Sequence, residues 1–540
     1  MHVVRSAPSV DVMLLLEGTF PYVSGGVSSW IDQIVRGFPE LRFGAVFIGS
    51  RPQDYDGMRY ALPDNLVHLE AHYVHASHEP PAVASHRGDR RAFEANARLH
   101  DALRGARGRP DAPGAPAPGA SAGLLREIVP SLSDDGPLSE RAFLYSERAW
   151  AFTTDRYKRF CTDPSFVDYF WTVRIMHAPI WMLARVAERL PPAGCYHAVS
   201  TGYAGLLGAM LRQRTGRRLL LSEHGIYTKE RKIDLFQSTW IADNRGVFDK
   251  DASQVAYFRD MWVRFFETLG RMCYEASDRI VSLYEANRRR QIADGAPAAR
   301  TECVANGVDL PRLAPLRARR AAVDPPPVAC LIGRVVPIKD VKTFVRAMRT
   351  VVDRLPGAQG WIAGPEDEDP AYARECRAVA ESLGLQDSVR FLGFQRVDEL
   401  LPRVGLVVLS SISEALPLAL LEGFAAGVPA VATDVGACRE LIHGLPGDDE
   451  ALGAAGEIVR IADPDGLARA VLGLLGDPTR WRDAQRAAIA RVESRYTQAT
   501  MFDRYRDLYR RALREPRAAA PGEAFDDPHV AGRDAAAPER

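Results

Sequence analysis

Residues 404–436 constrain the fold more than any other stretch, because two short apolar runs bracket a loop and a helical segment. Residues 407–410 have the character of a buried parallel strand, and residues 428–433 repeat it. Between them, residues 418–426 are helix formers, and Gly427 gives the helix a place to stop. A strand, a helix and a second strand in this order predict a parallel sheet in an α/β protein.

Two glutamates lie in this unit, separated by seven residues: Glu414 in the loop and Glu422 on the second helical turn. Pro417 suits the start of the helix, because its missing N–H would be unpaired there in any case. A helix N-terminus beside a parallel strand favours a phosphate ester, whereas carboxylates favour hydroxyl groups such as those of a ribose and a hexose. We therefore expect a nucleotide-sugar site here; the alternative is a pair of surface charges without a function.

A pair of cations marks a second candidate site. The apolar run 328–332 ends at Gly333, and Arg334 and Lys339 precede a helix that starts near Asp340. Arg can fork onto two phosphate oxygens, and Lys acts as a point charge. Together they predict a local diphosphate site, unless they are simply two solvated basic residues.

Composition narrows the class of partner. Lys plus Arg and Asp plus Glu number 69 each, so no overall basic field attracts nucleic acid. The seven Cys are scattered without a C-x-x-C pair, which favours a reducing, cytoplasmic compartment over a zinc site or a disulfide framework. The apolar segments 166–183 and 255–274 contain charged residues, so we expect core-facing helices rather than transmembrane segments, with a docking surface for a membrane partner as the alternative.

The first half of the chain also alternates strands and helices. Strands are predicted over 10–17, 43–49 and 66–73, and Gly25-Gly26 opens a helix after the first of them. A Gly pair at such a turn lets the backbone come close to a ligand, although many α/β proteins have one for packing alone.

His224 follows the predicted strand 218–222, at the edge where open sheets bind ligands. A lone His is often structural, but its position favours a functional role. The charges at Glu223 and over 229–231 are candidates for an acceptor pocket or, equally, a solvated run.

The chain divides by composition into two α/β halves, a linker and two low-complexity segments. We predict a first domain over 1–300 with a helical insertion and a disordered stretch at about 104–123, a linker over 301–327, a second domain over 328–494, a helix over 495–514 that returns to the first domain, and a disordered tail over 515–540.

The E-x7-E spacing and the G-R-x4-K pattern together resemble the retaining GT-B glycosyltransferases of family 4. This resemblance implies two Rossmann-like domains facing across a cleft, with Arg334 and Lys339 clamping the diphosphate and stabilising the leaving group in place of a metal. It also implies that Glu414 holds the donor sugar and Glu422 the ribose, and that His224 faces the sugar. The remaining donor-site residues that it implies are Gly25, Gly26, Phe394, Leu416 and Leu418. Pro417 stands where the family usually has Gly, which removes one backbone donor.

More narrowly, LLLEGTFPYVSGGVSSW at residues 14–30 resembles the opening of the PelF-type glycosyltransferases of Pel exopolysaccharide synthesis. That resemblance implies a UDP-sugar donor, a polysaccharide acceptor, no cofactor, and work beside inner-membrane Pel proteins on the cytoplasmic side. UDP-glucose, UDP-GlcNAc and UDP-GalNAc remain alternatives for the donor. A nucleotide-sugar epimerase or phosphorylase of the same fold, and an inert scaffold of a polysaccharide synthase, remain alternatives for the function.

Overall fold

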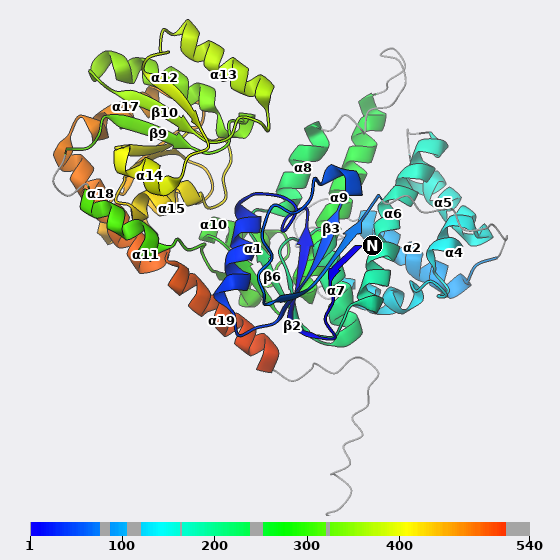
Figure 1. The fold of residues 1–540 in the computed structure, drawn as a ribbon. Helices are drawn as coiled ribbons and strands as arrows, with labels where there is room; N and C mark the ends of the chain where they lie inside the picture. Colours follow the sequence, from blue (N-terminus) through cyan, green and yellow to red (C-terminus); the bar gives the residue numbers. More distant parts are fainter. Residues whose placement is uncertain are drawn as a thin grey trace, which may run out of the picture.

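The computed structural model describes residues 2–75, 87–104, 120–161, 165–237, 252–319 and 324–514, which form two α/β domains (Figure 1). The first sheet has eight strands in the order β1-β4-β3-β2-β5-β6-β7-β8, and all of its strand pairs are parallel except β1 with β4. Its strands are β1 His2–Arg5, β2 Val10–Glu17, β3 Phe43–Gly49, β4 Leu66–Tyr73, β5 Ala193–Ala198, β6 Arg218–Glu223, β7 Arg279–Ser282 and β8 Thr301–Cys303.

The second sheet is parallel throughout, with six strands in the order β11-β10-β9-β12-β13-β14. Its strands are β9 Val328–Ile332, β10 Gln359–Ala363, β11 Val389–Gly393, β12 Leu406–Leu409, β13 Ala430–Thr433 and β14 Gly456–Val459. The predicted fold class, two Rossmann-like domains in a GT-B arrangement, is therefore confirmed.

Helices cover both faces of each sheet. Those of the first domain are α1 Gly26–Gly37, α2 Arg90–Arg104, α3 Ala120–Ile128, α4 Glu140–Tyr145, α5 Glu147–Phe160, α6 Phe166–Arg189, α7 Tyr203–Thr215, α8 Tyr227–Gln237, α9 Ala252–Ala276 and α10 Glu285–Ala293. The rest are α11 Leu310–Leu313, α12 Val341–Arg354, α13 Pro370–Ser382, α14 Val397–Leu400, α15 Leu418–Ala425, α16 Cys438–His443, α17 Pro464–Leu475, α18 Pro478–Arg495 and α19 Gln498–Arg514. None of the helices in the described ranges combines the length and apolar character needed to cross a bilayer.

The last helix returns to the first domain, as predicted. Figure 1 shows α18 beside the second domain and α19 running on beneath the first. The apolar face expected from three- and four-residue spacing along this helix is buried, and it consists of Met501, Tyr505, Leu508, Tyr509 and Ala512. The hydroxyls of Tyr505 and Tyr509 lie 2.8 Å from Ser222 Oγ and His197 Nδ1. These bonds fix α19 against β5 and β6.

Four boundaries differ from those predicted. Residues 301–303 belong to the first sheet rather than the linker, because β8 pairs with β7. Residues 120–123 start α3 instead of continuing the disordered stretch, since Ala120 and Ala122 are strong helix formers. The helical stretch expected over 139–160 is two helices, because Ser146 is extended and its side chain accepts from Ala149 N, which separates α4 from α5. The returning helix begins at Gln498 rather than residue 495. Residues 105–119 and 515–540 lie outside the described part of the chain.

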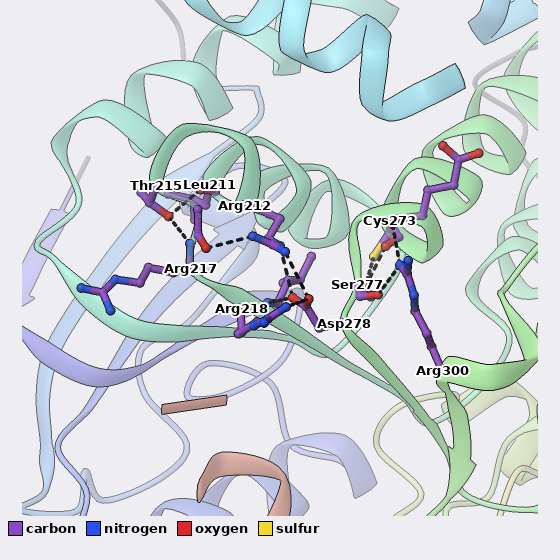
Figure 2. A network of polar contacts seen from close by, with 12 residues as sticks. Leu211, Arg212, Thr215, Arg217, Arg218, Cys273, Ser277, Asp278 and Arg300 are labelled. Carbon is purple, nitrogen blue, oxygen red and sulfur yellow. Dashed lines mark hydrogen bonds and ion pairs between the residues drawn. The ribbon is translucent and has the colours of Figure 1, made fainter. Parts of the chain in front are cut away.

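The amino-terminal edge of the first sheet is held by ion pairs, as Figure 2 shows. Asp278, just before β7, accepts from Arg218 Nη1 at 2.7 Å, from Arg212 Nη2 at 3.2 Å and from Leu219 N at 2.9 Å. Arg300 Nη1 donates to Ser277 O at 3.1 Å. These contacts hold the amino-terminal ends of the strands together. Ligands bind at the opposite, carboxyl ends of the strands in such sheets.

Candidate functional site

The candidate site lies where the strand order of the second sheet reverses. β9 is flanked by β10 on one side and by β12 on the other, so the loops that follow β9 and β12 diverge at this point. Open parallel sheets bind ligands outside the carboxyl ends of strands at such a switch point. Both predicted motifs fall here, since Lys339 follows β9 and Glu414 follows β12.

Lys339 and Glu414 are in direct contact, although 75 residues separate them in the sequence. Lys339 Nζ forms an ion pair with Glu414 Oε1, and the Ser411 hydroxyl donates to the same oxygen at 2.6 Å. The two charged side chains are only 21% and 12% exposed, which strengthens their attraction relative to a surface pair. Within the described residues both contacts fall on Oε1, so Oε2 is the oxygen that can accept from a ligand hydroxyl.

Neighbouring loops hold this pair in place through their backbones. The Ser410 hydroxyl donates to the carbonyls of Lys339 and Asp340 at 3.0 Å, and Ile412 N donates to Ile338 O at 2.9 Å. On the other side, Gly436 has a φ of +54°, and a Cβ there would lie 2.3 Å from Glu414 O. A glycine is therefore needed for the loop after β13 to pack against the Glu414 loop.

Arg334 does not join the Lys339–Glu414 pair. Its guanidinium instead lies 2.6 Å from both carboxylate oxygens of Glu368, in the loop after β10, and each side chain is about half exposed. An exposed ion pair of this kind contributes at most about 1 kcal/mol. A phosphate group can therefore compete with Glu368 for Arg334.

Glu422 lies on α15 beside Arg312 from α11. Arg312 Nη2 is 3.9 Å from Glu422 Oε1, while its Nε is 3.1 Å from Asp398 Oδ1. Burial raises the pKa of Glu422 to about 7; Arg312 opposes this rise and Asp398 adds to it. The carboxyl group thus changes charge near neutral pH, where an ordinary Glu is fully ionised.

His224 lies in the first domain, directly after β6. It is buried, and the centroid of its ring is 4.6 Å from that of Trp30 on α1. Burial lowers the pKa of His224 to about 4, so the ring is neutral at pH 7. Within the described part of the chain, Nε2 is buried without a hydrogen-bond partner, so a ligand hydroxyl that reached it could supply one.

The predicted Gly pair lies at the start of α1. Gly25 and Gly26 are both exposed, and Gly25 N lies 3.5 Å from the Tyr60 hydroxyl. A Cβ added at either glycine would meet nothing within 4 Å, so packing inside the protein does not require glycine here. A ligand that approaches the backbone would require it.

The other predicted donor-site residues have different environments. Phe394 directly follows β11 and is 78% exposed. Leu416 is buried among the core residues around α15, and Leu418, the first residue of α15, is partly buried. Pro417 immediately precedes the helix rather than opening it, with its φ at −72° and its ψ at 111°. Contact of Leu416 or Leu418 with a ligand can therefore come mainly from the backbone.

Sequence reasoning missed several partners of these residues. Glu368 and Arg312 are distant in the sequence from Arg334 and Glu422, and residue type alone did not predict those contacts. Ser411 is only three residues from Glu414, but its hydrogen bond depends on the conformation of the loop. The alternative of a solvated run is wrong for Glu223, which is 1% exposed and accepts from Tyr274 Oη at 2.7 Å and Gln291 Nε2 at 3.0 Å. Its position as the last residue of a buried strand was the available signal.

Two family models match this chain. One, described as a domain of unknown function, DUF3492, matches residues 10–299, which is more than half of the chain. The other, described as glycosyl transferases group 1, matches residues 326–477 and so includes Arg334, Lys339, Glu414 and Glu422.

One curated relative is similar over part of its length. D-inositol 3-phosphate glycosyltransferase 2 of Catenulispora acidiphila is 29% identical over 262 residues, which is 45% of this chain and 58% of that relative. The chain thus spans less than two thirds of that curated relative.

Two solved structures are similar over almost their whole length. Anabaena HepE in complex with UDP and glucose has a TM-score of 0.52 at 14% identity, covering 92% of this chain and 99% of that one. Sucrose-phosphate synthase from Thermosynechococcus elongatus also has a TM-score of 0.52, at 16% identity, covering 93% and 98%. At such low identity these likenesses show the GT-B fold alone. The chain therefore belongs to the family of the DUF3492 domain, which is joined here to a group 1 glycosyltransferase domain.

Proposed function

We propose that this protein is a retaining, metal-independent hexosyltransferase of the family 4 type. It transfers a hexose or N-acetylhexosamine from a UDP-sugar to a growing extracellular polysaccharide of the Pel type, on the cytoplasmic side of the inner membrane and beside membrane-embedded partners. The observation that carries the proposal is the contact between Lys339 and Glu414, which joins a cation for a diphosphate to a carboxylate for a sugar hydroxyl. The complex of HepE with UDP and glucose supports UDP as the nucleotide.

The second domain holds the donor in this proposal. Lys339 and Arg334 bind the two phosphates, and Arg334 exchanges its exposed pair with Glu368 for phosphate oxygens. Glu414 accepts from sugar hydroxyls through Oε2, and Glu422 accepts from the ribose hydroxyls. Phe394, with its exposed ring, lies against the base.

Transfer proceeds as negative charge grows on the departing UDP. Lys339 and Arg334 stabilise that charge more strongly than they stabilise the intact donor, which lowers the barrier. The leaving phosphate takes the proton from the acceptor hydroxyl on the same face of the sugar, so the anomeric configuration is retained. His224, neutral at pH 7, contacts the sugar from the first domain.

The test is to incubate the purified protein with UDP-glucose, UDP-GlcNAc and UDP-GalNAc in turn, with and without oligosaccharide acceptors. UDP release and the anomeric configuration of the product are followed by NMR, with EDTA in a parallel series. We expect one donor to be consumed, an axial donor linkage to give an axial product, and EDTA to have no effect.

Each other outcome identifies a different function. Conversion of the sugar without an acceptor would mean an epimerase, and an inverted product would refute retention. Loss of turnover in EDTA that added Mg²⁺ restores would refute metal independence. Absence of turnover and of nucleotide binding in a folded protein would favour the scaffold.

A further inference from the structure

The helices α5 and α6 expose an unusual number of large apolar side chains. Val167, Trp171 and Ile175 follow one another at four-residue spacing along α6 and are 60%, 54% and 45% exposed, and Trp150 on α5 is 57% exposed. The opposite side of α6 is buried in the domain core through residues such as Tyr169 and Val173. Packing in the domain core explains why one side of α6 is apolar, but it does not explain the apolar residues on the exposed side.

These side chains form one continuous surface. The ring centroids of Trp150 and Phe166 are 5.4 Å apart, those of Trp150 and Phe170 are 6.1 Å apart, and those of Phe170 and Trp171 are 5.5 Å apart. We call this surface the aromatic patch, and it consists of Trp150, Phe166, Val167, Phe170, Trp171 and Ile175. A cluster of this kind on a protein surface indicates an interaction site.

Basic residues accompany the patch. The Arg174 guanidinium lies 4.1 Å from the ring centroid of Phe170 and 5.8 Å from that of Trp171. Lys158 is exposed near the end of α5, next to Tyr157, whose ring centroid is 5.2 Å from that of Phe166. Over residues 140–160 and 166–189 there are eight Lys and Arg against five Asp and Glu, whereas the whole chain has 69 of each. Part of this excess is balanced by Asp101 and Asp134, which pair with Arg156, Arg185 and Arg189. The positive charge beside the rings therefore comes mainly from Arg174 and Lys158.

The patch is far from the candidate donor site. Figure 1 shows α4, α5 and α6 on the side of the first domain that faces away from the second domain. A large partner could therefore cover the patch without reaching Lys339 or Glu414.

We propose that the aromatic patch docks on the surface of an anionic phospholipid bilayer. Trp combines a broad apolar ring with a polar N–H and favours the boundary between headgroups and acyl chains, where Val167 and Ile175 would also leave water. Lys158 can hold its charge among the headgroups while its stem stays on the apolar surface. Arg174, whose Nη2 donates to Leu144 O, adds a fixed positive charge beside the rings. Each such cation near an anionic leaflet adds to binding, which is why the occupant is charged lipid rather than a neutral surface. This inference does not depend on the proposed function.

The experiment measures co-sedimentation of the full chain with vesicles of phosphatidylglycerol and phosphatidylcholine, and with phosphatidylcholine alone. The test variant is Val167→Ser/Trp171→Ser/Ile175→Ser. The matched control is Val3→Ser/Leu452→Ser/Ile461→Ser, because those three side chains are also 39–44% exposed but lie on other elements. We expect the test variant to bind anionic vesicles about tenfold more weakly or worse, and the control to bind as the wild type does.

A second variant separates charge from apolar contact and does not disturb the core. Lys158→Glu should weaken binding to anionic vesicles by about tenfold and leave any residual binding to phosphatidylcholine unchanged. Tryptophan emission should shift to shorter wavelength on vesicle addition, and less so in Trp171→Phe.

Three results would overturn the proposal. The first is that the folded wild type does not bind anionic vesicles. The second is that the control variant loses as much affinity as the test variant. The third is that the wild type binds neutral vesicles as tightly as anionic ones. Concentration-dependent self-association that only the test variant loses, with no vesicle binding, would instead assign the patch to a second copy of the chain.

Discussion

The carboxyl ends of the two sheets both carry glutamates, but the protein uses them differently. In the first sheet, Glu17 and Glu223 end β2 and β6, and both accept hydrogen bonds from several groups of the protein itself. In the second sheet, Glu414 has one oxygen engaged by Lys339 and Ser411, and the Glu422 carboxylate lies 3.9 Å from the Arg312 guanidinium.

The first-sheet carboxylates hold loops and helices together. Glu17 accepts from Tyr227 Oη at 2.7 Å and from Ala204 N at 3.2 Å, so it joins the start of α7 to α8. Glu223 also accepts from Tyr227 N at 3.0 Å. A carboxylate whose oxygens are already used in this way has little capacity for a ligand, whereas those of the second sheet retain it. A carboxylate at the carboxyl end of a strand is therefore a stronger candidate for ligand binding when its oxygens are not already used by the protein.

The largest expected effect is on catalysis. Lys339→Ala should lower kcat by about a hundred- to a thousandfold, because the charge that balances the leaving diphosphate is lost. Lys342→Ala is the matched control, since Lys342 lies on α12 and pairs with the exposed Glu375. Steady-state assays with the preferred UDP-sugar distinguish them, and an equal loss in both variants would contradict the assignment.

The second largest effect is expected on the stability of the first domain, at the carboxyl end of β6. Glu223→Ala should lower the free energy of unfolding by about 3 kcal/mol, because several buried donors lose their acceptor. Urea denaturation measures it, with the exposed Glu399→Ala as the control. Unchanged stability together with lost turnover would place Glu223 in catalysis. The glutamates of the two sheets would then no longer differ in role.

Glu422 should produce a smaller effect that depends on pH. Because its folded pKa of about 7 lies above that of an unfolded Glu, its contribution to stability is fully present below about pH 4 and is lost as pH rises towards 7. The full shift corresponds to about 3 kcal/mol, and solvent screening of the partly exposed side chain lowers the effect. Relative to Glu422→Gln, the wild type should therefore lose about 2 kcal/mol of unfolding free energy between pH 4 and pH 8. Parallel denaturation series at both pH values test this, and a constant difference would refute the raised pKa.

Loss of a single contact from α19 should have the smallest effect. Tyr505→Phe removes the hydrogen bond to Ser222, the residue before Glu223, and should cost about 1 kcal/mol of unfolding free energy. The change in melting temperature reports it. A change of several kcal/mol would mean that α19 contributes more than the buried glutamates to the stability of the carboxyl end of β6.

Local pattern predicted much of the fold. The strands at Val10–Glu17, Phe43–Gly49 and Leu66–Tyr73 and the buried face of α19 follow directly from apolar runs and helical spacing. The short edge strand β8 was missed because three residues carry too little pattern to mark a strand. The break at Ser146 was missed because Ser fits both a helix interior and an N-cap.

The candidate site was predictable in residue type but not in arrangement. Lys339 and Glu414 stand out because each follows a buried strand beside a helix start. Their contact depends on β9 and β12 being neighbours, which is a property of the strand order. The pairing of Arg334 with Glu368 and the raised pKa of Glu422 depend on packing between loops and helices, so sequence spacing holds no signal for them.

Calorimetric titration with UDP is the most direct test of the proposed donor site, because it needs neither the acceptor nor the correct sugar. We expect UDP to bind the wild type and Lys342→Ala alike, and to bind Lys339→Ala about ten- to a hundredfold more weakly, as expected for one lost charged hydrogen bond. Failure of the folded wild type to bind UDP, or equal affinity in all three proteins, would contradict the proposed donor site.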